Sequence, residues 1–177
     1  IRISSIEPTT IPIKLIKKMA KTSKLCRHLH IPLQSGSNLI LKLMKRKYSV
    51  EKFRDFIYKA YDTVPEICLG TDVIVGFPGE TEKNFEETAR YLNQWPMHYL
   101  HVFSYSQRHL AKSQKYPQTI DLRTISKRSR ILRELSIRKR DLFYRSLIGT
   151  KQKVLFEQFK NGYWSGLTDN YARINVK

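Results

Sequence analysis

The amino-acid sequence predicts an α/β fold, in which strands first alternate with helices and a basic helix and a small β segment then follow. Two observations support this prediction. Runs rich in β-branched and aromatic residues recur along the first two thirds of the chain, and amphipathic segments lie between them. Such an alternation is typical of a parallel sheet or a (β/α) barrel.

Four strands are expected in this first part. The earliest begins at the start of the chain, where apolar and polar residues alternate as they do in a half-buried strand. The third is an apolar, β-branched run bounded by glycine and proline, which is typical of a buried strand. The expected strands are residues 1–6, 29–33, 67–75 and 99–105.

Helices are expected between and around these strands, because apolar residues recur there at the spacing of one helix face. Residues that commonly cap helices mark three of the starts, namely Ser37, Ser49 and Thr81. Pro65 ends the helix that follows Ser49. The expected helices are residues 11–20, 38–46, 50–64 and 82–92.

The last part of the chain is expected to be basic and then to form β structure. Gly149 ends a long helix, and Asn161 and Gly162 supply the signal of a hairpin turn. The expected segments are a basic loop at 106–120, a helix at 124–147 and β segments at 153–159 and 163–176. The predicted units are residues 1–120, 121–148 and 149–177, and we expect the chain to begin inside the first and to end inside the last.

Composition favours an anionic partner. The 177 residues include 33 Lys and Arg against 15 Asp and Glu, which gives a net charge of +18. This excess favours nucleic acid first and an anionic membrane surface second, and the alternative is a solvated basic surface. We see no membrane-spanning run and no signal peptide, so we expect a cytoplasmic protein that is not bound to a membrane.

Asp72 lies inside the expected strand 67–75, where a carboxylate is costly unless a group hydrogen-bonds to it. The fold or a ligand must therefore satisfy it. In a parallel sheet or barrel, ligands bind at the carboxyl ends of the strands. The expected strand ends are polar or rich in glycine; they hold Glu7, Gln34–Ser35, residues 76–80 and residues 104–108.

No metal site is expected from the residues themselves. We expect His28 and His30 to face opposite sides of a strand, to serve structural roles and to be unable to chelate one metal ion together. Cys26 and Cys68 have neither the spacing of a metal site nor that of a disulfide framework, so we interpret them as reduced thiols.

Several separated stretches, taken together, resemble the tRNA methylthiotransferase family of radical S-adenosylmethionine (SAM) enzymes. They are HIPLQSGS at residues 30–37, LMKR at 43–46 and TDVIVGFPGET at 71–81. RISSIEP at 2–8 and YLHVFSYS at 99–106 are similar to the branch that modifies threonylcarbamoyladenosine at tRNA position 37. The resemblance covers most of residues 1–150.

This resemblance implies the later strands of a partial radical-SAM (β/α) barrel, whose strand ends bind SAM. By motif position, Gln34 would contact the ribose or methionyl part, Arg46 the methionyl carboxylate, Asp72 the ribose and Ile74 the adenine. The other predicted cofactor-binding residues on this rim are Glu7 and Ser35. Arg46 also belongs to a run of four cations, so a solvated role is its alternative.

The family also has a β domain called TRAM, and residues 149–177 resemble its first part. The implied partner is the anticodon stem-loop of tRNA, whose phosphates Lys and Arg would contact without reading bases. The expected RNA-binding residues are Arg108, Arg128, Arg138, Arg140 and Tyr105. Tyr105 and Phe103, at a strand end, would stack on a splayed nucleotide, and core packing is the alternative for Phe103. A monomer is expected.

The sequence departs from the family in its cysteines. The resemblance implies two 4Fe-4S clusters in the full-length parent, and none of their cysteine ligands is in this chain. A further departure is QRHLAKS at residues 107–113, where the family has a proline-rich segment. We therefore expect no catalytic residue and no metal ligand in the chain, and no activity of the chain alone.

In the implied reaction, SAM is cleaved reductively, the resulting radical takes hydrogen from the adenine ring, and a methylthio group replaces it. Two alternatives stay open. One is another radical SAM methylthiotransferase, such as the branch that acts on a ribosomal protein. The other is a basic RNA-binding module that has no catalytic role.

Overall fold

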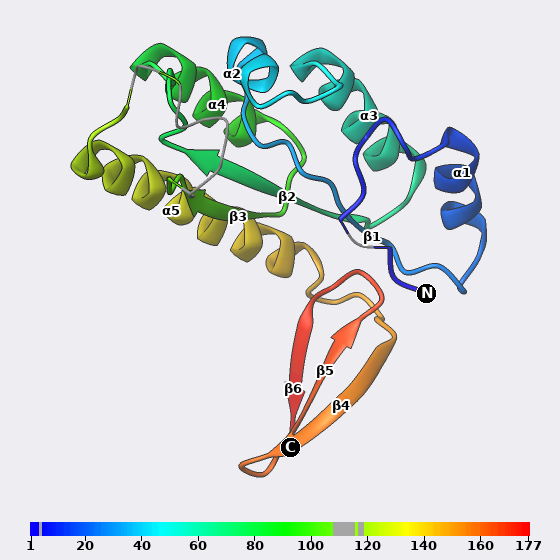
Figure 1. The fold of residues 1–177 in the computed structure, drawn as a ribbon. Coiled ribbons are helices and arrows are strands. Elements are labelled where there is room, and N and C mark those ends of the chain that lie inside the picture. Colours follow the sequence, from blue (N-terminus) through cyan, green and yellow to red (C-terminus); the bar gives the residue numbers. More distant parts are fainter. Residues whose placement is uncertain (4, 108–115, 117–118) are drawn as a thin grey trace.

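The computed structural model describes residues 1–3, 5–107, 116 and 119–177. Its first layer is a parallel sheet of three strands, β1 (His28–His30), β2 (Cys68–Val75) and β3 (Tyr99–Ser104). Their order in the sheet is β1-β2-β3, so each strand pairs with the next one along the chain (Figure 1). Three of the four predicted strands are thus present.

The predicted strand at residues 1–6 is wrong. Among its described residues, Ile3 forms a single parallel bridge to Leu29 and the Ile6 N–H donates to the His30 carbonyl, but no strand is formed. Ser5 has a φ of 51°, which is incompatible with an extended strand. Ile3 and Ile6 still pack against the core, which explains why the segment has an alternating pattern without forming a strand.

Four helices precede or connect the strands, as the sequence predicts. They are α1 (Ile13–Lys21), α2 (Asn38–Leu43), α3 (Val50–Thr63) and α4 (Glu82–Gln94). The side chains of Ser49 and Thr81 accept hydrogen bonds from the backbone N–H groups of Lys52 and Asn84, as N-caps do. Ser37 occupies the N-cap position of α2, but its side chain makes no capping hydrogen bond there.

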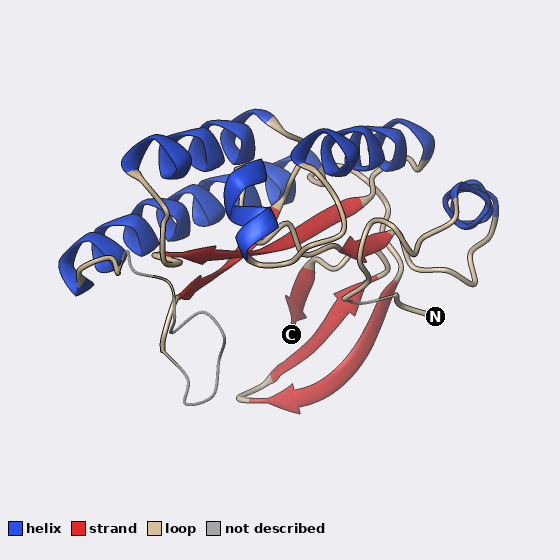
Figure 2. Ribbon diagram, turned by 45° about the horizontal axis from the view of Figure 1, so that its top comes forward, coloured by secondary structure: helices blue, strands red, loops and turns tan. Residues whose placement is uncertain are grey.

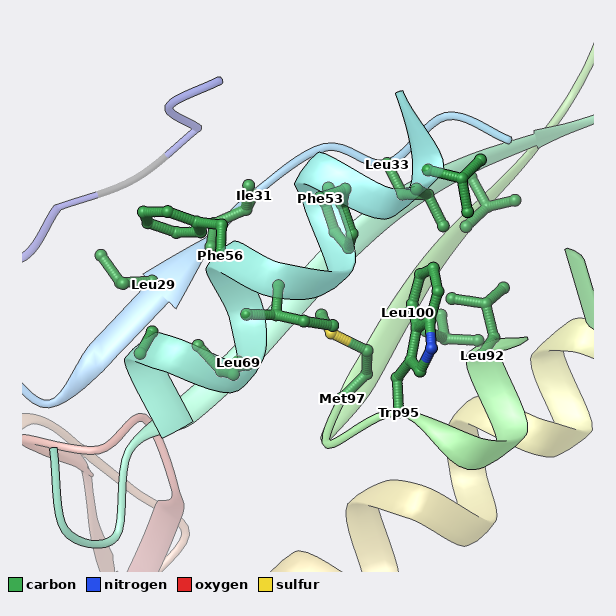
Figure 3. Close-up of a cluster of buried hydrophobic side chains, with 14 of the residues drawn as sticks. Leu29, Ile31, Leu33, Phe53, Phe56, Leu69, Leu92, Trp95, Met97 and Leu100 are labelled. Atoms are coloured by element: carbon green, nitrogen blue, oxygen red, sulfur yellow. The ribbon is translucent and has the colours of Figure 1, made fainter. Parts of the chain in front are cut away.

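The core lies between these helices and one face of the sheet. Alternate residues of β2, such as Leu69 and Val73, point into it, because side chains of a strand alternate between the two faces. Figure 3 shows the centre of this cluster. Its labelled members are Leu29, Ile31, Leu33, Phe53, Phe56, Leu69, Leu92, Trp95, Met97 and Leu100.

The long helix α5 (Leu122–Ser146) packs along β3. It begins two residues before the predicted start, because the side chain of Asp121 caps it by accepting a hydrogen bond from the Thr124 N–H. The Ser136 hydroxyl accepts from the Leu100 N–H and donates to the Leu100 carbonyl. This exchange fixes α5 against β3, so the helix is part of the same folded unit as the sheet.

A second, antiparallel sheet follows, made of β4 (Val154–Lys160), β5 (Tyr163–Thr168) and β6 (Arg173–Val176). The predicted β segment 163–176 is therefore two strands with a turn between them. Figure 2 shows this sheet on the side of the parallel sheet that most of the helices leave open. The predicted fold class, a partial barrel with a basic helix and a small β unit, is confirmed.

Candidate functional site

Five polar side chains project from the parallel sheet on the face opposite the core: His28, His30, Asp72, Tyr99 and His101. The prediction that His28 and His30 face opposite ways is wrong. They are two residues apart on β1, so both point to the same face. The same period of two, applied to β3, identifies Tyr99 and His101 as members of this cluster, which our sequence reading missed.

These five side chains form one chain of contacts. The Tyr99 hydroxyl lies 2.9 Å from His28 Nε2 and 2.9 Å from His30 Nδ1. His30 Nε2 lies 2.8 Å from Asp72 Oδ1, and His101 Nδ1 lies 3.3 Å from the same oxygen. The described residues therefore contact the Asp72 carboxylate through Oδ1. A ligand would meet the other oxygen, Oδ2.

The hydrogens along this chain can be placed by valence. An ionised Asp72 only accepts, so His30 donates to it from Nε2 and uses Nδ1 to accept from the Tyr99 hydroxyl. Tyr99 in turn accepts from His28 Nε2, whose other ring nitrogen is buried without a partner. Burial, with a smaller effect of Arg2, lowers the pKa of His28 to about 3, so its ring is neutral.

Two adjoining cavities open on this face. One, of about 370 Å³, is bordered by Asp72, His101, Phe103 and Arg2. The other, of about 220 Å³, lies between the sheet, α5 and the second sheet; Arg140, Phe143, Tyr144 and Arg173 line it. Both cavities share Tyr99, His101 and Tyr171. The polar face of the sheet is thus accessible from the side of α5 that carries Arg140.

The predicted rim residues make two groups of contacts, one between Gln34 and β2 and one between Arg46 and Glu7. Gln34 has a φ of 67° and bridges to β2, since its N–H donates to the Asp72 carbonyl and its carbonyl accepts from the Ile74 N–H. Arg46 donates to Glu7 Oε1 at 3.0 Å, and its buried Nε has no partner among the described residues. An unpaired buried donor is costly, which points to a ligand beside Arg46.

Ser35 has a local role in the structure. It is fully buried, and its hydroxyl accepts a hydrogen bond from the Ser37 N–H. This bond shapes the turn that leads into α2, so Ser35 supports the rim. Ile74 lies on the same face of β2 as Asp72 and is partly exposed. Its side chain therefore offers an apolar surface, as the predicted adenine contact requires.

The turn at residues 76–80 is held by a buried ion pair. Glu80 is 1% exposed, and its carboxylate accepts hydrogen bonds from the Gly76 N–H at 2.7 Å and from Arg128 at 2.8 Å. Burial raises the pKa of Glu80, while Gly76 and Arg128 act in the opposite direction. Arg128 is 3% exposed and also pairs with Glu82, so its guanidinium has a structural role, and the RNA contact expected of it stays a prediction.

The other predicted RNA-binding residues have different surroundings. Arg138 and Arg140 are exposed on α5, and Arg140 borders the cavity beside the second sheet. Tyr105 packs edge-on against Phe77, with ring centroids 5.4 Å apart. Arg108 lies outside the described residues. Two of the five predicted residues, Arg138 and Arg140, are thus exposed cations in the structure.

Comparison with known proteins decides the family. Residues 1–92, which include the rim and the first two strands, match the family model of the radical SAM superfamily. This chain belongs to the radical SAM superfamily. Its three parallel strands and the helices between them are consequently the later part of a radical SAM barrel.

Curated relatives confirm the predicted resemblance to tRNA methylthiotransferases. The chain is 38% and 36% identical to the threonylcarbamoyladenosine tRNA methylthiotransferases MtaB of Aquifex aeolicus and Bacillus subtilis, over 98% and 100% of its length. It is 36% identical to the tRNA-2-methylthio-N(6)-dimethylallyladenosine synthase of Endomicrobium trichonymphae. The chain spans 40–42% of these relatives.

Two solved structures share the fold at low sequence identity, and the first of them is described as a radical SAM enzyme. Coproporphyrinogen III oxidase from Escherichia coli has a TM-score of 0.51 and 18% identity, over 82% of this chain and 31% of that protein. Elp3 from the archaeon Methanocaldococcus infernus has a TM-score of 0.57 and 13% identity, over 98% and 55%. Within the described part of the chain, no helix has the length and apolar character needed to cross a membrane.

The cysteines of this superfamily member do not fit an iron–sulfur cluster, which thiolates hold. The chain has two cysteines, Cys26 and Cys68. Burial raises the pKa of the Cys68 thiol to about 12, so it stays protonated at neutral pH. The residues present therefore suit SAM, as the unpaired Arg46 nitrogen indicates, but they do not suit the cluster.

Proposed function

We propose that this chain is the SAM-binding and RNA-facing part of a tRNA methylthiotransferase, whose substrate is N6-threonylcarbamoyladenosine in the anticodon stem-loop. The observations that carry the proposal are the Arg46–Glu7 ion pair and the backbone contacts of Gln34 with Asp72 and Ile74 on β2. The names of the first two relatives support the choice of nucleoside.

The rim offers a matching group for each part of SAM. The Arg46 guanidinium would hold the methionyl carboxylate, because a planar cation with several N–H donors suits a carboxylate. Asp72 Oδ2 and Gln34 would meet the ribose hydroxyls, and Ile74 would contact the adenine. Bound SAM supplies radical chemistry only together with a reducing cluster, and we therefore propose that these 177 residues are inactive alone.

Exposed arginines on α5 and on the second sheet would position the RNA. Arg140 and Arg173 are exposed and line the cavity between the two sheets, and Arg138 is exposed on the same helix as Arg140. Their charges would attract an anionic strand that approaches the polar face. Such phosphate contacts add affinity without base specificity. We propose that the second sheet acts as a TRAM-like RNA-binding unit. We also propose that the protein is cytoplasmic and monomeric.

We predict that Arg46→Ala weakens SAM binding at least tenfold, because a hydrogen bond to a charged group contributes about 1.5–3 kcal/mol. Isothermal titration calorimetry with SAM measures the change. The matched control is Lys47→Ala, which removes an exposed cation of the same run. Equal affinities of the wild type and Arg46→Ala would contradict the assignment of the carboxylate to Arg46.

The function itself is tested by nucleoside analysis. Deletion of the gene in its own organism should remove the methylthio derivative of threonylcarbamoyladenosine from digested tRNA and leave its unmodified precursor. Mass spectrometry of the nucleosides measures both species, and complementation with the wild-type gene should restore the product.

Other outcomes of this deletion would support the alternatives. Loss of the methylthio group from dimethylallyladenosine alone would assign the protein to the second group of relatives. Loss from a ribosomal protein would identify the other methylthiotransferase branch. Unchanged modification of all three, together with tRNA binding by the purified protein, would favour an RNA-binding module without catalysis.

A further inference from the structure

We propose that His30, Asp72 and His101 form a binding site for one divalent transition-metal ion such as Zn²⁺. The three potential ligand atoms are His30 Nε2, Asp72 Oδ1 and His101 Nδ1, and all lie within 4.8 Å of one another. They come from three adjacent strands and point to one side of the sheet. This proposal departs from the expectation that the chain holds no metal ligand.

Two of the three separations are close to those around a small metal ion. Two ligand atoms of a tetrahedral zinc site are about 3.3 Å apart, since each lies about 2.0–2.1 Å from the metal. The distance from Asp72 Oδ1 to His101 Nδ1 is already 3.3 Å. His30 Nε2 is at 2.8 Å, in a hydrogen bond that a metal would replace by moving the ring about half an ångström.

The donor set selects the type of ion. Two imidazoles and one carboxylate suit Zn²⁺, Co²⁺ or Fe²⁺, whereas Mg²⁺ and Ca²⁺ prefer sites made of oxygen ligands. Cys68 lies on the same face of β2, but it is buried and protonated, and it is not among the grouped ligands. The proposed site therefore has nitrogen and oxygen ligands without sulfur.

Tyr99 supplies the outer support that metal-binding histidines commonly have. A metal on His30 Nε2 requires the ring hydrogen on Nδ1, which lies 2.9 Å from the Tyr99 hydroxyl. A hydroxyl both donates and accepts, so Tyr99 can serve either tautomer of His30. The Tyr99 ring is itself fixed against Gly70, where a Cβ would overlap it.

The site is accessible on one side. The side chain of His101 is 53% exposed, and the cavity beside Arg2 and Phe103 adjoins the three ligands. A metal with three protein ligands would keep a fourth position open toward this cavity, as catalytic zinc sites do. The proposal does not depend on SAM binding, because the metal uses Asp72 Oδ1 and is measured without SAM.

The test is a titration of the untagged, reduced protein with Co²⁺, followed by the visible absorption of the bound ion. We expect saturation at one Co²⁺ per chain. His101→Phe and Asp72→Asn should each weaken binding at least tenfold, and Tyr99→Phe about tenfold. His101 is exposed, so its replacement leaves the fold intact, which circular dichroism checks.

Two matched controls separate this site from other nitrogen and sulfur ligands. His98→Asn replaces a histidine whose Nδ1 accepts from the Leu69 N–H, away from the proposed ligands, and should leave the affinity within threefold of the wild type. Cys26→Ser should also leave it unchanged. The proposal is overturned if Co²⁺ binding is not saturable, if it survives both His101→Phe and Asp72→Asn, or if it depends on Cys26.

Discussion

Arg128→Ala is expected to lower the free energy of unfolding by about 3–5 kcal/mol, because it leaves the carboxylate of Glu80 buried without its partner. Arg128 and Glu80 are 3% and 1% exposed, and the guanidinium also donates to the Glu80 carbonyl. The pair joins α5 to the turn at residues 76–80. Urea denaturation followed by circular dichroism measures the loss.

The control for this prediction is Arg145→Ala, which lies on the same helix. Arg145 pairs with Asp141, but both side chains are more than half exposed, so its removal should change stability by no more than about 0.5 kcal/mol. If Arg128→Ala instead keeps its stability and loses RNA affinity, the structural role is wrong and the original RNA-contact prediction regains support.

Acidification is expected to destabilise the protein by about 2–4 kcal/mol between pH 7 and pH 5. Burial lowers the pKa of His28 to about 3 and that of His98 to about 4, from an ordinary value of 6.5; Arg2 and Lys139 respectively add to the effect. Both histidines are therefore neutral in the folded protein. Below pH 6.5 the unfolded chain binds more protons, so stability is lost as the pH falls.

Denaturant titrations at pH 7, 6 and 5 check this dependence. His28→Gln keeps a side-chain N–H near Tyr99, and His98→Asn keeps an acceptor for the Leu69 N–H. Each single variant should lose about half of the pH dependence, and the double variant most of it. A double variant with the same slope as the wild type would show that other groups cause the acid sensitivity.

Local patterns sufficed for most of the fold. The helix starts at Ser49 and Thr81 follow from capping chemistry, which acts over three residues and can be recognised in a sequence. The failure at residues 1–6 has a different origin. Alternation there reflects the packing of Ile3 and Ile6, while the positive φ of Ser5 depends on tertiary contacts that a local pattern does not record.

The site was only partly predictable for the same reason. Family motifs predicted Gln34, Arg46 and Asp72, and in the structure Gln34 bonds to the backbone of Asp72 while Arg46 pairs with Glu7. The partner of Asp72 was missed, because His101 is distant in sequence and becomes its neighbour only through the register of β2 with β3. Charge alone likewise did not distinguish the buried Arg128 from exposed arginines.

The second sheet is attached to the parallel sheet near the start of β1. Arg27 holds Asp169 through two hydrogen bonds of 2.8 and 2.9 Å, and Arg2 donates to the carbonyls of Thr168 and Asp169. These contacts join positions 142 to 167 residues apart. Contacts of such long range form late in folding, because loop closure must precede them. We therefore expect the hairpins of β4–β6 to form early, by local pairing, and the orientation of this second sheet against the parallel sheet to be set in one of the last folding steps.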